Sequence, residues 1–196
     1  RDYKVTGVQT CALPIYFARA TSDAATGALF SAAVDAPEAL VNGPTRVSYD
    51  GDVSGGTSME VKADGTNTAE SESKVLTGAA IAFQGGTAEA AVGDGADVSA
   101  IVGSNSDIDG LSQNLTVTAL SQNMATALSG ADGGGIVSIQ VIRPSATDNA
   151  DTKAELNGDV GGTHVDPAVG LVGDAGALEI EVSAHGDDVK IGRAHV

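Results

Sequence analysis

A five-residue alternation of apolar and polar side chains occurs three times along the chain. Each copy has a large apolar residue, a polar residue, Val, a polar residue and Ala, at residues 59–63 (MEVKA), 115–119 (LTVTA) and 180–184 (IEVSA). A period of two is typical of a strand with one buried face. We therefore expect Val61, Val117 and Val182 to point into a core, together with the alanine two positions after each.

The spacing of these copies indicates a repeat. They are centred on Val61, Val117 and Val182, so the two intervals between them are similar and the second is slightly longer. The pattern Ala-x-x-x-Asn-x-Ala follows the first copy at residues 63–69 and the second at residues 119–125. Phrases that recur together along a chain are typical of stacked repeats.

Two further features complete the repeated unit. Apolar segments led by Gly occupy residues 27–34, 78–83 and 135–141. A Thr followed after five residues by Gly-Asp begins at Thr45, Thr87 and Thr152, and Gly-Asp predicts a corner of the chain. This alignment places the nine-residue difference between units at residues 101–113, as a loop.

Several short strands in each unit predict an all-β fold. The apolar residues are mainly Ala and Val, and Trp is absent. Small side chains suit a thin core between stacked strands, so we expect a parallel β-helix, or β-solenoid, with about three coils of roughly 20 residues in each unit. A β-sandwich-type repeat array is the alternative, although its domains would need large alternating residues and aromatic anchors.

The two ends of the sequence resemble translated sequencing adapter. Residues 5–15 read VTGVQTCALPI and residues 191–196 read IGRAHV. DNA that encodes the second string is the reverse complement of DNA that encodes part of the first, as expected when one adapter is ligated to both ends of a fragment. We therefore assign residues 1–15 and 190–196 to adapter, and residues 16–189 to a β-solenoid segment of a longer chain.

Charge and cysteine content narrow the function classes. Four of the 10 basic and one of the 26 acidic residues lie in the adapter-like ends, which leaves six basic and 25 acidic residues, a net charge of −19. Nucleic-acid binding requires clustered Lys and Arg, so a nucleic-acid partner is not expected. The single cysteine, Cys11, also lies in an adapter-like end, which excludes disulfides and thiol catalysis from the rest. No apolar run is long enough to insert in a membrane.

The order of these features resembles a known class of protein. An Ala-rich tract, a Gly-led apolar strand, a Thr-x5-Gly-Asp corner and the alternating strand are similar to the repeats of large secreted bacterial filamentous-haemagglutinin-like and leukotoxin-like filamentous adhesins. The resemblance covers about residues 18–189. It implies a β-helical filament, secreted or on the bacterial cell surface, that meets cell-surface, extracellular-matrix or glycan partners through other parts of the full-length protein.

One local motif fits the first half of a calcium-binding loop. Asn105, Asp107 and Asp109 alternate and are followed by Gly110, a pattern that can direct oxygen ligands to one cation. A complete loop would have a bidentate Glu where Thr116 stands. The motif therefore predicts a solvated acidic loop, with a weak calcium site as the alternative, and no other cofactor.

No catalytic constellation is evident. His164 and His185 have no Cys or His cluster beside them, so surface histidines are expected rather than zinc ligands. Glu179 and Glu181 alternate with Ile180 and are expected on a solvent face. We therefore expect a non-catalytic structural segment of an adhesin-like protein, with a β-helical polysaccharide-acting enzyme or a calcium-stiffened exoprotein as alternatives.

Overall fold

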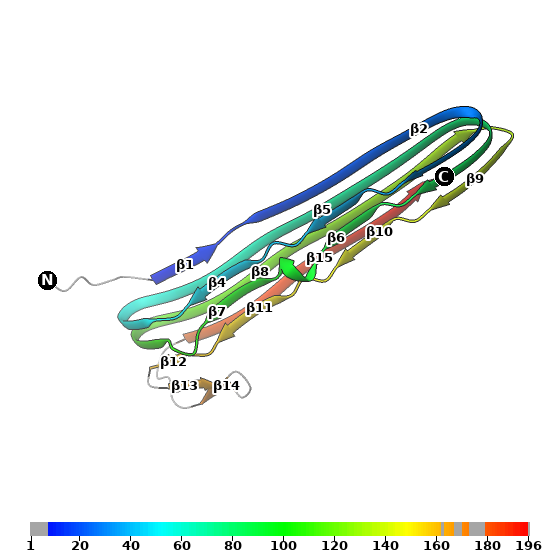
Figure 1. Ribbon diagram of the computed structural model, residues 1–196. Coiled ribbons are helices and arrows are strands. Elements are labelled where there is room, and N and C mark those ends of the chain that lie inside the picture. Colours follow the sequence, from blue (N-terminus) through cyan, green and yellow to red (C-terminus); the bar gives the residue numbers. More distant parts are fainter. Residues whose placement is uncertain (1–7, 162, 167–169, 173–178, 196) are drawn as a thin grey trace.

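The fold is a stack of flattened coils built from parallel strands. The computed structural model describes residues 8–161, 163–166, 170–172 and 179–195. Long strands run along one side of each coil and shorter strands return along the other (Figure 1). A single 3₁₀ turn, η1 (Asp94–Ala96), is the only helical element in these residues. The prediction of an all-β solenoid is confirmed.

The long strands form one side of the stack. β2 pairs with β5, β5 with β8, and β8 with β15, all in parallel, and the short β1 precedes β2 on the same edge of β5. Their bounds are Val8–Ala12 for β1, Ile15–Asp35 for β2, Asp52–Gly86 for β5, Asp107–Gly134 for β8 and Glu179–His195 for β15.

The return side begins with the ends of β2 and β5 and with β9 (Val137–Ile142), which pairs with the end of β5, and continues with two three-stranded parallel sheets. One has the order β10-β6-β3 and the other β11-β7-β4. The bounds are Glu38–Val41 (β3), Thr45–Tyr49 (β4), Glu89–Val92 (β6), Val98–Val102 (β7), Ser145–Asp148 (β10) and Thr152–Leu156 (β11). The remaining strands are β12 (Asp159–Val160), β13 (Thr163–Asp166) and β14 (Gly170–Val172).

Each repeated unit forms one complete coil. Val61 pairs with Val117 and Val117 with Val182, so strands that are one full unit apart in the sequence are neighbours in the stack. Asn67 likewise pairs with Asn123. The expectation of several short coils in each unit is therefore wrong. The polar tract after the alternating strand continues it as one long strand, because its small Ala, Ser and Asn side chains fit the narrow interior.

The predicted corners are correct in two units of three. Thr45 and Thr152 both pair with Val98, and Asp52 and Asp159 both pair with Asp107. The match at Thr87 is wrong, since Thr87 precedes β6 and the Gly93-Asp94 pair opens η1, which connects the two three-stranded sheets of the return side. The extra residues of the longer interval lie between Val160 and Glu179 rather than at residues 101–113, because the strands on either side keep their register with β8.

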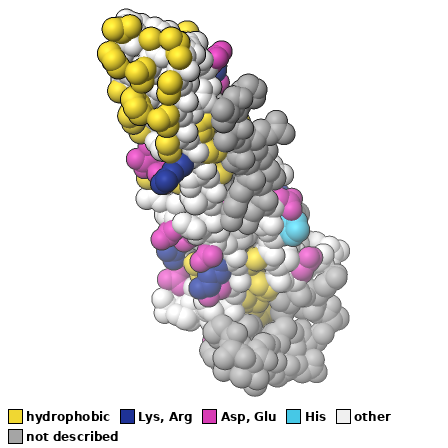
Figure 2. All heavy atoms as spheres, turned by 90° about the vertical axis from the view of Figure 1, so that its right-hand side faces the viewer, with side chains coloured by type: hydrophobic (Ala, Val, Ile, Leu, Met, Phe, Trp, Pro, Cys, Tyr) yellow, Lys and Arg dark blue, Asp and Glu magenta, His cyan; other side chains and the backbone are white. Residues whose placement is uncertain are grey.

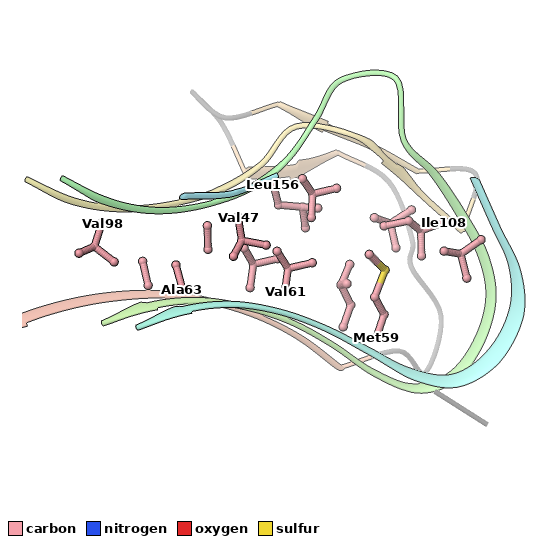
Figure 3. Close-up of a cluster of buried hydrophobic side chains, with 14 residues drawn as sticks. Val47, Met59, Val61, Ala63, Val98, Ile108 and Leu156 are labelled. Atoms are coloured by element: carbon pink, nitrogen blue, oxygen red, sulfur yellow. The ribbon is translucent and has the colours of Figure 1, made fainter. Parts of the chain in front are cut away.

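The main hydrophobic core lies at the bend where β4, β7 and β11 lead into the next long strand, which we call the base. Figure 3 shows Met59, Val61 and Ile108 between the two layers of strands near this bend. Val61 and Val117 are fully buried there. Gly55 and Gly110 have positive φ at the bend, and a side chain on Gly110 would meet the backbone of Gly55 at 3.1 Å.

The opposite end, which we call the tip, comprises the bends at residues 27–30, 78–81 and 134–137 and the strand residues on either side of them. Inward positions in β5 are odd-numbered up to Ala79 and even-numbered from Ala82, so the alternation shifts by one residue there. The buried apolar cluster of the tip is small and consists of Ala33, Val75 and Ala131. Its interior also holds polar side chains, such as Asp35 and Ser73, which are joined by a 2.9 Å hydrogen bond.

The last long strand departs from the predicted burial. Val61 and Val117, with Ala63 and Ala119, are buried as expected, whereas Val182 is 44% exposed and Ala184 is also exposed. Both keep their register with β8. They are open to solvent because, among the described strands, only β8 pairs with β15.

Residues of the adapter-like ends continue this stacking. β1 pairs with residues 59–63 of β5, and residues 190–195 pair with residues 125–130 of β8. Residues 1–7 and 196 lie outside the described residues. Because an added strand can extend any open sheet edge through its backbone, this pairing is compatible with an adapter origin, which stays a prediction.

Candidate functional site

The predicted calcium motif lies at the base, where the chain enters β8. Asn105 and the two aspartates are exposed. Asn105 is held by Asp50 of the preceding coil: its backbone N–H donates to Asp50 Oδ1 at 3.2 Å, and its Nδ2 donates to Asp50 Oδ2 at 3.1 Å. The amide of Asn105 thus caps a neighbouring loop rather than standing apart as a ligand.

Asp107 belongs to a column of aspartates that runs from coil to coil. Asp52 precedes it and Asp159 follows it at the same register position. The carboxylate of Asp109 has the largest influence on Asp107, and together with Asp52 and Asp159 it raises the pKa of Asp107 above its ordinary value. Like charges at neighbouring positions disfavour a second ionised group, which is the cause of this shift.

Gly110 of the motif is explained by the fold. Its φ of 70° and its close approach to Gly55 are what the base bend requires, so its presence does not depend on a bound ion. In the described part of the chain, no group of three or more His, Cys, Asp or Glu residues could hold a metal ion. The structure brings Asp107 and Asp109 close together and directs Asn105 to Asp50.

The other residues considered for chemistry are dispersed. His185 is exposed and its Nε2 lies 3.2 Å from Asp187 Oδ1, while the side chain of His164 lies outside the described part. Glu181 is exposed, as the alternation predicts; the side chain of Glu179 is not among those described. Glu181 and His185 lie four residues apart on β15, and the described ionic contact of His185 is with Asp187 rather than with Glu181.

Four of the described basic side chains form separate surface ion pairs. Lys62 pairs with Asp64 at 3.4 Å, and Arg19 with Glu70 at 3.8 Å. The hydrogen bond and the attraction of Glu72 raise the pKa of Lys74. Exposed pairs of this kind contribute little to stability, and they leave each cation neutralised by a neighbour on its own or the adjacent coil.

Sequence reasoning missed an apolar surface at the tip. Figure 2 shows apolar side chains gathered at this end of the molecule, above a surface where charged side chains are interspersed. A shallow groove lies on this surface and is lined by residues that include Val34, Phe83, Gly85 and Val141. The Gly-led segments were the sequence signal that could have revealed this surface. They are apolar at consecutive positions and therefore put apolar residues on both faces of the strand.

Among the described residues there is no helix with the length and hydrophobicity needed to cross a membrane. Comparison of the chain with protein-family models, with curated proteins and with solved structures found no match.

Proposed function

We propose that this chain is a non-catalytic structural segment of a secreted or cell-surface adhesin-like protein of bacteria. The observation that supports this proposal is the in-register stacking of equivalent positions, in which Val61, Val117 and Val182 succeed one another on adjacent long strands. A stack of this kind can be extended by one coil at a time without a new core. In the proposed protein it forms a rod, and recognition of cell-surface or glycan partners belongs to other parts.

The outward surface supports a structural role. Outward positions of β5 and β8 carry mostly polar residues, among them Glu60, Thr116 and Thr118. Four of the described cations, Arg19, Lys62, Lys74 and Lys153, form ion pairs at separate places rather than one charged cluster. Catalysis by a β-helical polysaccharide-acting enzyme would need acidic and basic groups converging on one substrate. The exposed faces of the described coils therefore favour the rod over the enzyme.

Reading the gene beyond both ends of this sequence tests the proposal. Further coils with the same phrase, at intervals like those between Val61, Val117 and Val182, together with an export or anchoring domain, would support it. A single solenoid closed by caps and containing a polar cleft would contradict it. Incubation of the purified chain with acidic and neutral polysaccharides provides a second test, because release of reducing or unsaturated ends would establish an enzyme.

A further inference from the structure

The outer surface of the return side, next to the tip, is apolar over three adjacent coils. Three residues from each of β2, β5 and β9 point outward and are paired across the strands. We call these nine residues the apolar grid. Its rows are Phe30, Ala32 and Val34 from β2, Ile81, Phe83 and Gly85 from β5, and Val137, Ile139 and Val141 from β9.

The grid is exposed although it holds the largest apolar side chains of the tip. Phe83, at its centre, is 50% exposed, and Val34 is 80% exposed. Beneath it, the interior contains small or polar side chains, such as Ala33 and Gln84. Folding of one chain therefore leaves the better apolar surface outside, where only a second surface can bury it.

The size of the grid is that of one side of a protein interface. With about 150 to 200 Å² for a fully exposed large residue, the exposed fractions of Phe30, Val34, Phe83, Val137, Ile139 and Val141 give roughly 500 to 700 Å², somewhat below the ~800 Å² that each partner contributes to a standard interface. Sheets pack face to face at about 10 Å when their side chains interdigitate. The grid has the area and the strand pairing for that packing.

The shape of the grid is self-complementary. Phe83 projects from β5, and two residues further on Gly85 leaves a depression between Val34 and Val141, which forms the groove described above. A twofold axis that lies between the two copies, parallel to the sheet, perpendicular to the strands and above Gln84, would place Phe83 of each copy over Gly85 of the other. A symmetric dimer requires this reciprocity, in which one residue contacts a second and the second contacts the first.

The charge distribution also favours contact at the grid. The chain has a net charge of −16, so two copies repel each other over most approaches. None of the nine grid residues is ionisable. We propose that the apolar grid is a dimerisation surface on which two copies of this chain pack face to face about a twofold axis.

Sedimentation velocity of the full chain, from about 1 to about 200 μM, tests the proposal, since this range spans weak to moderate self-association. A reductant prevents cross-linking through the exposed Cys11. The expected result is a concentration-dependent rise from the 19.3 kDa monomer to twice that mass. Added salt should favour the dimer, because it screens the repulsion between acidic surfaces.

Two substitutions make the test specific to the grid. Phe83→Asp should keep the chain monomeric over the whole range. Leu40→Asp is the matched control, because Leu40 is 51% exposed on β3, outside the grid, and this variant should dimerise like the wild type. Circular dichroism establishes that both variants are folded; if Phe83→Asp is not, Val34→Asp replaces it, since the higher exposure of Val34 makes its replacement harmless to folding.

Three results would overturn the proposal. One is a wild-type chain that stays monomeric over the whole concentration range, whether or not it binds neutral phosphatidylcholine vesicles instead. Another is a folded Phe83→Asp variant that dimerises like the wild type. The third is equal loss of the dimer in the Leu40→Asp control, which would show that added negative charge, rather than the grid, controls association.

Discussion

The base and the tip are two bends of the same coil, yet they distribute apolar side chains in opposite ways. At the base, Met59, Val61 and Ile108 are buried between the layers. At the tip, Phe30 and Phe83 face outward while Asp35 and Ser73 are inside. The difference indicates that the base stabilises the single chain, whereas the tip offers its apolar surface to a partner.

The largest difference is expected between a charge placed in the core of the base and a charge placed on the surface of the tip. Val117→Asp should destabilise the chain by more than about 4 kcal/mol, because it buries an unpaired carboxylate in the core of the base. Val34→Asp at the tip should change stability by less than about 0.5 kcal/mol, because Val34 is largely exposed. Urea unfolding of the two variants measures this contrast, and equal losses would remove the distinction between base and tip.

A smaller effect is expected inside the tip, where hydrogen bonds rather than apolar contacts hold the layers. Ser73→Ala removes the donor to the buried carboxylate of Asp35 and should cost about 1.5 to 3 kcal/mol. Ser48→Ala, at an exposed outward position of β4, is the control and should be neutral. Chemical denaturation is again the measurement; a neutral Ser73→Ala variant would mean that the polar interior of the tip does not contribute.

A still smaller effect is expected at Asp107, in the column of aspartates at the base. Because the folded-state pKa of Asp107 is raised, ionisation of this group lowers stability once the pH exceeds that pKa, and the penalty is absent below the ordinary aspartate pKa of about 3.9. Asp107→Asn should therefore raise the unfolding midpoint slightly at pH 7 and leave it unchanged near pH 3.

The exposed Asp94, in the turn between β6 and β7, provides the control for that pH series, because Asp94→Asn removes one negative charge outside the aspartate column and should change the midpoint less than Asp107→Asn at pH 7. A lower midpoint for Asp107→Asn at pH 7 would contradict the assigned repulsion within the aspartate column, since it would mean that the carboxylate stabilises the corner.

Calcium is expected to give the smallest effect. Because Asn105 is engaged by Asp50 and Thr116 occupies the bidentate position, calcium should bind diffusely to the acidic surface, without a defined stoichiometry. Calorimetric titration at physiological salt should show weak heats that shrink in proportion to charge in the Asp107→Asn, Asp109→Asn double variant. A one-to-one isotherm that this variant abolishes would establish a specific site.

The sequence predicted the long strands better than it predicted their connections. Alternation at residues 59–63 and 115–119 has one physical cause, burial of one face, and the structure confirms it. Coil size was mispredicted because the polar tract after residue 63 lacks large apolar residues and looks like a series of turns, although its small side chains are buried. The Thr87 match failed because the Thr and Gly-Asp spacing alone does not distinguish a corner from a turn that connects two sheets on the same side of the coil.

The two candidate sites, the calcium motif and the apolar grid, also differed in how far the sequence could predict them. The calcium motif is a local pattern, so its residues were found, but its partner Asp50 is 55 residues from Asn105 and could be identified only from the stacking. The apolar grid depends on the pairing of three segments in different coils and on the shift in alternation near Ala79. Neither feature can be derived from a single window of sequence.

Disulfide cross-linking between adjacent coils tests most directly the claim that one unit forms one coil, on which the comparison of base and tip depends. The hydroxyl oxygens of Thr118 and Ser183 lie 3.5 Å apart, although the residues are 65 positions apart in the chain. In a Cys11→Ser background, Thr118→Cys with Ser183→Cys should oxidise readily to an intramolecular disulfide. Thr118→Cys with Glu181→Cys, which is displaced by two residues, should do so much more slowly. Equal rates for the two pairs, or no cross-link in the first, would contradict this register and with it the one-unit coil.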